Sequence, residues 1–312
     1  MNELVNAAGL ERVEHLDDAN GLARAGLESV RLDLAGAIVE VRFDCPDAAQ
    51  LYRRRYRHML SDGRPGRIAY AVAQKPDEHF FWVEGGSAYR WRGSPLKPHA
   101  VAFFTDAVVG TTVFRSLENV VTLHAAAISD GFSAAAIIGS TTAGKTTTAI
   151  ACARRGLALY SDEFCIVAPN GILPFPRSLS LRCAATEVLA NDPVPSSAVD
   201  AWLRTHGCCD GYDLGYDELF GTLERPAPRP LRTAFVLIGK GAQPSIREVS
   251  RVAMVAHAGP WAKLKASGFE AFETLLALFE GVACYEVVLG SPDATARAIR
   301  RTMERVPRVD AA

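Results

Sequence analysis

Residues 133–163 read SAAAIIGSTTAGKTTTAIACARRGLALYSDE, and this stretch decides the fold. Its apolar start at 133–138 predicts a buried strand, residues 145–155 predict a helix, and residues 157–160 predict a second strand. Between the first strand and the helix, GSTTAGKT (139–146) fits the phosphate-loop pattern G-x-x-x-x-G-K-[ST]. Strand, glycine-rich loop, helix and strand in close succession predict an α/β core.

The phosphate loop predicts a site for ATP and Mg²⁺. Its glycines let backbone N–H groups turn toward phosphate oxygens, and the helix that follows directs its positive end to the same place. Lys145 supplies a positive charge for the β- and γ-phosphates, and the Thr146 hydroxyl supplies a ligand for Mg²⁺. An ordinary strand–turn–helix is the alternative. The nucleotide is expected to contact the whole loop: Gly139, Ser140, Thr141, Thr142, Ala143, Gly144, Lys145, Thr146 and Thr147.

An acid pair follows closely. Asp162 comes only 17 residues after Lys145, with Glu163 next to it, at the end of the second strand. One carboxylate can hold the metal while the other accepts the proton of an attacking hydroxyl, so both are candidate metal-side acids. Because neighbouring side chains of a strand point to opposite faces, the pair must sit where the strand breaks. A solvated turn is the alternative.

The residues before the phosphate-loop domain predict a small α+β domain, so we divide the chain into residues 1–117 and 118–312. Alternating apolar residues and turn signals predict the elements of the first domain. These are strands at 30–34, 38–43, 67–73 and 80–89, with helices at 48–60 and 101–117. In the second domain we also expect strands at 120–128, 164–168, 235–238 and 284–289, and helices at 269–281 and 292–305.

Composition excludes several classes of function. The net charge of −1 over 312 residues gives no overall attraction to nucleic acid or to an anionic membrane. The first residues carry acids without a long apolar core, unlike a signal peptide, and no segment approaches the roughly 20 apolar residues that span a bilayer. Seven cysteines without a C-x-x-C pair argue against disulfides and structural zinc. We expect a cytoplasmic protein that binds neither nucleic acid nor membrane.

The basic run RRRYRH at 53–58 invites a nucleic-acid interpretation. On a helix, however, the arginines mostly cover the side opposite to the apolar residues Leu51, Tyr52, Tyr56, Met59 and Leu60. A solvated helix face is therefore the simpler interpretation, with a docking surface for an acidic peptide as the alternative.

The stretch 123–167 resembles the HPr kinase/phosphorylase family, and more closely its smaller HPr-kinase-like relatives. Four features match in order: His124 in LHAAAIS, the loop GSTTAGKT, the helix ending in ARRG, and the pair Asp162-Glu163. A similar core occurs in phosphoenolpyruvate carboxykinases, whose phosphate loop also reads G-K-T-T. The segment PFPRSLSLR (174–182) and the strand GVACYEVVLG with its closing helix also look like those of HPr-kinase-like proteins.

The resemblance implies an ATP-dependent serine kinase. Asp162 would be the general base, Glu163 a metal-side acid, and His124 a neighbour of the reacting phosphate, while Lys145 and Thr146 contact phosphate and Mg²⁺. Two positions depart from the family, since Glu163 stands where aspartate is usual and Thr142 where the loop usually has glycine. Some HPr-kinase-like proteins belong to peptide-modification pathways, including those of lasso peptides. The expected partner is therefore a protein or precursor peptide with an acceptor serine.

Two arginines after the acid pair, Arg177 and Arg182, suit the stabilisation of a transferring phosphoryl group, with ordinary surface arginines as the alternative. Arg182 is included among the catalytic candidates. Two other functions stay open: a kinase for a small hydroxylated metabolite, and a regulator that binds ATP without transferring phosphate. The oligomeric state also stays open, a homo-oligomer included.

Overall fold

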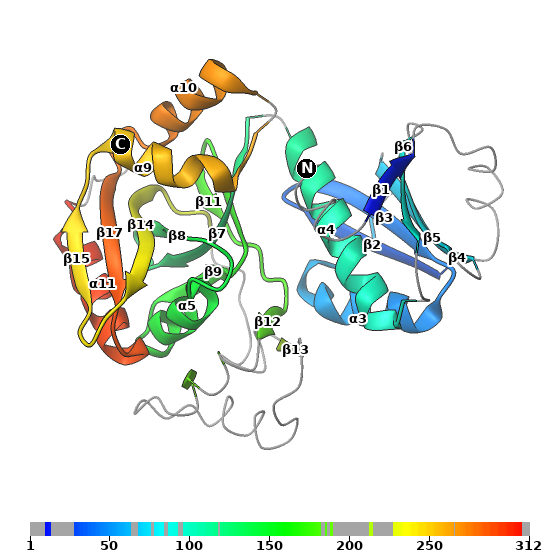
Figure 1. Ribbon diagram of the computed structural model, residues 1–312, viewed down its shortest axis with the longest axis horizontal. Coiled ribbons are helices and arrows are strands. Elements are labelled where there is room, and N and C mark those ends of the chain that lie inside the picture. The colour runs from blue at the N-terminus through cyan, green and yellow to red at the C-terminus, as the bar shows by residue number, and fades with distance from the viewer. Residues whose placement is uncertain are drawn as a thin grey trace. The chain divides into compact units, whose positions relative to one another are not determined.

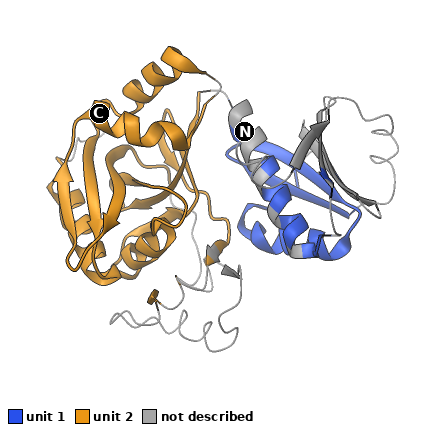
Figure 2. Ribbon diagram, viewed as in Figure 1, with its two compact units in different colours: residues 1–117 blue, residues 118–312 orange. Residues whose placement is uncertain are grey.

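The computed structural model describes residues 10–13, 28–63, 68–75, 78–83, 87–92, 96–117, 119–181, 185, 188–189, 212–214, 227–264 and 266–307. The chain falls into two compact units, residues 1–117 and residues 118–312 (Figure 2). Each unit has its own sheet and its own buried residues, and each is described by itself.

The first unit is a six-stranded sheet with strand order β1-β6-β5-β4-β3-β2 (Figure 1). Its described helices are α3 (Pro46–Arg55), η1 (Arg57–Met59) and α4 (Pro98–Ser116). Proline stands in the first turn of both α-helices, where its missing N–H would have no partner within the helix. The strands are β1 (Leu10–Val13), β2 (Glu28–Leu34), β3 (Ala37–Phe43), β4 (Ile68–Lys75), β5 (Glu78–Val83) and β6 (Ser87–Arg92).

Two expectations for this unit are corrected. The single strand predicted at 80–89 is two strands, β5 and β6, which pair antiparallel. The basic run is also not uniformly solvated, because Arg55 is buried and its guanidinium lies 3.0 Å from the Asp106 carboxylate of α4. The hydroxyl of Tyr56 contacts the same carboxylate. Arg55 therefore joins α3 to α4, while Arg53 and Arg54 are exposed as expected.

The second unit contains a large mixed sheet with strand order β11-β10-β7-β8-β14-β17-β15, with β9 and β16 also paired to β7. Strands β8, β14 and β17 run parallel, whereas β7 is antiparallel to β8 and β15 is antiparallel to β17. The expected α/β class is therefore present, with a mixed sheet. The strands are β7 (Val121–Ser129), β8 (Ala134–Ile138), β9 (Ala158–Ser161), β10 (Phe164–Ala168), β11 (Gly171–Leu173), β14 (Leu231–Lys240), β15 (Ser245–Glu248), β16 (Ala262–Lys263) and β17 (Ala283–Leu289), and β12 (Leu179–Leu181) pairs separately with β13 (Tyr212–Leu214).

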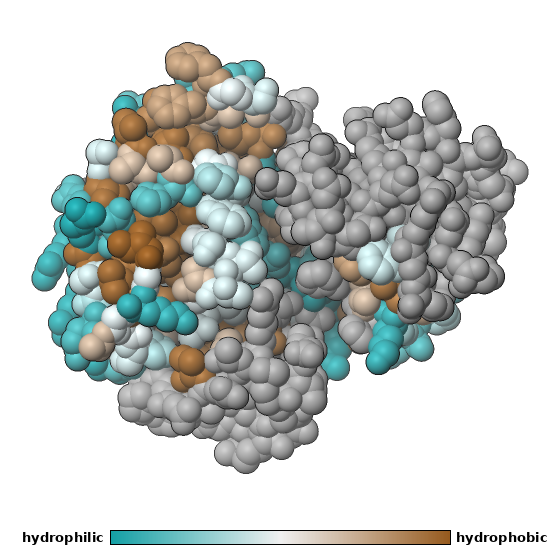
Figure 3. Space-filling model, viewed as in Figure 1, coloured by the Kyte–Doolittle hydropathy of each residue, from teal (hydrophilic) through white to brown (hydrophobic). Residues whose placement is uncertain are grey.

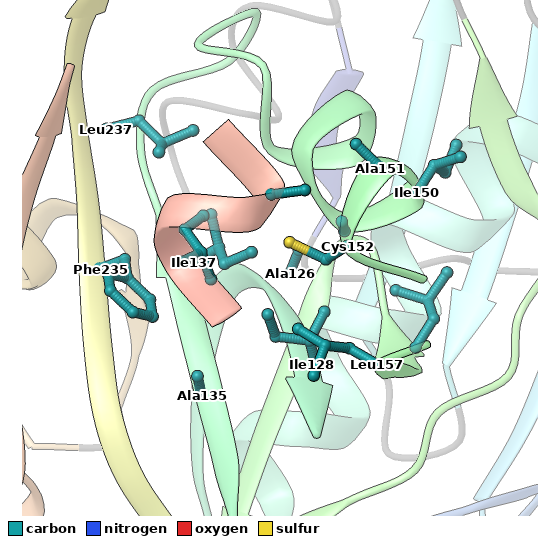
Figure 4. Packing of buried hydrophobic residues seen from close by; sticks show 14 of the residues in the cluster. Ala126, Ile128, Ala135, Ile137, Ile150, Ala151, Cys152, Leu157, Phe235 and Leu237 are labelled. Atoms are coloured by element: carbon teal, nitrogen blue, oxygen red, sulfur yellow. The ribbon is translucent and has the colours of Figure 1, made fainter. Parts of the chain in front are cut away.

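Two helices pack on each face of this sheet. Helices α5 (Lys145–Arg154) and α11 (Pro292–Arg305) share one buried cluster with Ala126 and Ile128 of β7 (Figure 4). Helices α9 (Arg251–Ala258) and α10 (Gly268–Leu278) share the other cluster with residues 123, 125 and 127 of the same strand. The alternation along β7 thus assigns its even-numbered residues to the face covered by α5.

Apolar side chains reach the surface over α10 (Figure 3). Phe269 is 72% exposed, and its ring stacks on that of Phe272 with ring centroids 6.3 Å apart. Within the described part of the chain, no helix combines the length and the apolar character needed to span a membrane.

Candidate functional site: a phosphate loop and an acid pair at one edge of the sheet

The phosphate loop connects β8 to α5 as the sequence predicts. Strand β8 ends at Ile138, and α5 begins at Lys145 with Gly144 as its N-cap. Gly144 has φ +106°, a backbone conformation that favours glycine, and a Cβ atom there would lie 3.0 Å from Leu289 Cδ1 of β17. As the N-cap residue, Gly144 has no side chain that could bond the first amide groups of α5, and such groups at a helix start can bind an anion.

Lys145 lies folded into the loop that precedes it. Its Nζ donates hydrogen bonds to the carbonyl oxygen of Gly139 at 2.8 Å and to that of Ser140 at 3.0 Å. The side chain is buried, so these two carbonyls compensate a charge that has lost part of its water. By contrast, Ser140, Thr141 and Thr142 are exposed on the rim of the loop. An anion on this rim would meet backbone amides with the ammonium close behind them.

Thr142 adopts a left-handed backbone with φ +69°. This region is unfavourable for a β-branched residue and is normally taken by glycine. Thr142 therefore holds a backbone conformation that glycine adopts more easily.

The acid pair lies in the break between β9 and β10, two strands that pair with the same side of β7. Strands β9 and β10 pair with the same β7, with Ser161 opposite Ala127 and Phe164 opposite His124. Between them the Ser161 hydroxyl accepts hydrogen bonds from the amides of Glu163 at 3.3 Å and Phe164 at 2.9 Å. This local turn interrupts the strand at residues 162 and 163, which confirms that the pair sits at a strand break.

Strand β7 links the acid pair to the phosphate loop. On one side of β7, Ala125 is opposite Ile138, the last residue before the loop. On the other side, the amide of Ala125 donates a 3.1 Å hydrogen bond to the carbonyl of Glu163. The two motifs therefore leave the sheet at the same level, separated by two strand spacings, or about 10 Å.

Arg177 holds both carboxylates. Its guanidinium lies 3.7 Å from Asp162 Oδ1 and contacts the carboxylate of Glu163. Because the strand is interrupted at these two residues, both of their side chains can point toward the same cation. Its central carbon also lies 5.4 Å from the centroid of the Phe164 ring. Arg177 is 1% exposed, Asp162 5% and Glu163 34%, so Glu163 is the more accessible acid. Arg177 is thus a buried partner of the acids, not a surface arginine.

His124 lies between the loop and the acids. Its Nδ1 is 3.9 Å from Glu163 Oε1, and its ring centroid is 5.9 Å from that of Trp261. The pKa of His124 is lowered to about 4, first by burial and then by the charge of Lys145, and Glu163 only partly opposes this. The imidazole is therefore neutral at pH 7, and it can donate one hydrogen bond and accept another.

The predicted metal ligands lie on two different elements. Thr146 is the second residue of α5 and is half-buried, whereas Asp162 and Glu163 lie at the strand break. Within the described ranges, no three His, Cys, Asp or Glu side chains gather as ligands for a metal ion. This donor set fits Mg²⁺ bound mainly through phosphates and water, with few protein ligands, as is common for this ion. Arg182 lies outside the described residues.

Two site residues had no signal in the sequence. Trp261, in the 3-10 turn η2 (Gly259–Trp261), lies 5.8 Å from Lys145 Nζ to its ring centroid. Lys263, on the two-residue strand β16, lies 4.5 Å from the centroid of Phe164. They belong to no motif. The pairing of β16 with β7 brings Lys263 to the ring of Phe164, and Trp261 directly precedes this strand.

No known family model matches the chain. A search of curated proteins also gives no significant match. The resemblance to HPr-kinase-like proteins therefore stays a prediction carried by the motif residues themselves.

Proposed function

We propose that this chain is an ATP-dependent phosphotransferase that moves the γ-phosphoryl group to a hydroxyl, with a serine of a protein or precursor peptide as the acceptor. In this proposal residues 118–312 form a kinase domain of the HPr-kinase and phosphoenolpyruvate-carboxykinase type. The observation that carries it is the common level of the phosphate loop and the acid pair on β7. About 10 Å between the two backbones leaves room for a terminal phosphate and an attacking oxygen.

The loop residues would bind the nucleotide. The loop amides and the start of α5 would surround the β- and γ-phosphates, and Lys145 would exchange its two carbonyl partners for phosphate oxygens. Thr146 and Glu163 would hold Mg²⁺, which when bound neutralises negative charge on the phosphates. Glu163 suits this task better than Asp162 because it is more exposed and therefore easier to reach from the phosphates.

The acid pair would activate the acceptor. As the hydroxyl oxygen forms its bond to the γ-phosphorus, the bond to the β-γ bridging oxygen breaks and ADP leaves with that electron pair. The hydroxyl proton passes to Asp162, the base in this assignment. Arg177 keeps this carboxylate in place, and the neutral His124 offers a hydrogen bond beside the reacting group without adding charge.

The proposal is tested by following label from γ-³²P-ATP into candidate peptides and metabolites, beside ATP affinity by calorimetry. Wild type should bind Mg·ATP and transfer label to a peptide serine, and Lys145→Ala should weaken both binding and transfer. Label in a small metabolite instead would assign a metabolite kinase. Tight binding without any transfer, unchanged in Asp162→Asn, would assign a nucleotide-binding regulator.

A further inference from the structure

We infer that Lys263 is a further catalytic residue, whose ammonium contacts the phosphoryl group as it passes from the phosphate loop to the acceptor beside Asp162. This inference rests on the proposed phosphotransferase function and adds to it a residue that no motif contains. Two observations support it: the register of β16 and the direction of the side chain.

The strand register places β16 next to the point where β8 ends and the phosphate loop begins. Strand β8 pairs with β7 as far as Ile138, opposite Ala125, and there the chain turns away into the loop. Strand β16 pairs with β7 immediately beyond, with Ala262 opposite Leu123 and Lys263 opposite Thr122. Because β10 occupies the other side of β7 at these residues, β16 must continue the side that β8 has left.

The side chain of Lys263 then crosses β7 toward the acids. Residues directly opposite each other in a sheet share a face, so Lys263 lies on the face of Thr122 and His124, which is also the face covered by α5. Its Nζ is 4.5 Å from the centroid of Phe164, the residue that follows the acid pair on the far side of β7. The ammonium therefore lies over β7, between the loop and the acid strand.

Two lysines therefore flank the path between the loop and the acid pair. Lys145 lies on the loop side and Lys263 on the side of Phe164. A phosphoryl group that moves from the loop toward Asp162 would leave the first cation and approach the second. A cation placed there stabilises charge that spreads over the transferring group.

The test uses the full chain with Lys263→Met, Lys263→Arg and, as a matched loss of one exposed charge in the same unit, Arg301→Met on α11. Calorimetry measures the affinity for Mg·ADP with and without aluminium fluoride, a mimic of the transferring phosphoryl group, and a phosphate assay measures hydrolysis of Mg·ATP. Lys263→Met should bind Mg·ADP with an affinity within about threefold of that of wild type. The increase in affinity caused by aluminium fluoride and the rate of ATP hydrolysis should each be about 10²-fold smaller than in wild type. Lys263→Arg should recover most of both losses, and Arg301→Met should lose neither.

The outcomes separate this inference from the proposed function. If wild type tightens on aluminium fluoride and Lys263→Met tightens equally, the assignment of Lys263 is overturned while the phosphotransferase stands. The assignment is also overturned if Lys263→Met weakens Mg·ADP and the mimic equally, because Lys263 would then act only on binding or on the packing of Phe164. If wild type itself binds no nucleotide, the proposed function fails and the inference fails with it, whereas binding of Mg·ADP without any tightening would overturn the inference alone.

Discussion

The guanidinium of Arg177 lies 3.7 Å from the carboxylate of Asp162, with both side chains almost fully buried. The same guanidinium also contacts Glu163, which is partly exposed. One cation thus serves two neighbouring acids whose mutual repulsion would otherwise be strong in this partly dry environment. The backbone supports the arrangement, because Arg177 N donates to Phe175 O and Phe175 N donates to Tyr160 O, both at 2.8 Å.

Replacing this cation should destabilise the fold. Arg177→Gln leaves Asp162 buried without its countercharge, and we expect a loss of about 3 kcal/mol in the free energy of unfolding. Urea unfolding followed by circular dichroism measures it. The double variant Arg177→Gln with Asp162→Asn removes the uncompensated charge and should recover part of the loss. A cost below about 1 kcal/mol for the single variant would contradict a buried ion pair of this kind.

The two acids should differ in their effects on the reaction. Asp162→Asn is expected to lower phosphoryl transfer by about 10²–10⁴-fold, the usual contribution of a general base, while ATP affinity stays close to that of wild type. Glu163→Gln should instead raise the Mg²⁺ concentration needed for half-maximal transfer. Its carboxylate is the more exposed one and is the proposed ligand of Mg²⁺. Transfer rates over a Mg²⁺ series distinguish the two. A large loss of ATP affinity in Asp162→Asn would remove its assignment as the base.

His124 should make the stability of the fold depend on pH. Its pKa is about 4 in the folded chain against 6.5 in an unfolded one, so between these values the unfolded chain takes up the proton more readily. The contribution of the neutral imidazole to the free energy of unfolding is complete above pH 6.5 and is lost as the pH falls toward 4. Between pH 7 and pH 5, wild type should lose roughly 1–2 kcal/mol more than His124→Gln. Urea unfolding of both proteins at each pH measures this, and equal losses would show that the imidazole is not buried.

Thr142 should be replaceable by glycine with a gain in stability. Its φ of +69° is costly for a β-branched residue, so Thr142→Gly should stabilise the fold by up to about 1 kcal/mol. Thr141 is its exposed neighbour without a positive φ, and Thr141→Gly should instead destabilise by about 0.5 kcal/mol. Thermal unfolding of the two variants compares them. A loss of stability in Thr142→Gly would mean that the threonine side chain stabilises the loop by more than the backbone strain costs.

Several strands and helices could be predicted because the spacing of apolar residues within each segment indicates its secondary structure. The period of two in residues 30–34 and 38–43 and the amphipathic period in 292–305 each match an observed element. Strand β15 and helix α9 were missed. Most of β15 is exposed at the sheet edge, so it carries no apolar alternation. Helix α9 has only eight residues, too few to show a clear period.

The sequence alone determined the phosphate loop and the position of the acid pair. Strand, loop, helix and acids are contiguous in the chain, so their geometry follows from neighbouring residues. Only the tertiary structure decided which cations meet them. Arg177 reaches the acids because the segment after β11 returns along β9, and Lys263 reaches β7 because β16 fills the pairing edge that β8 leaves. Both contacts arise from hydrogen bonds to strands β9 and β7, and no local pattern of residues encodes this pairing.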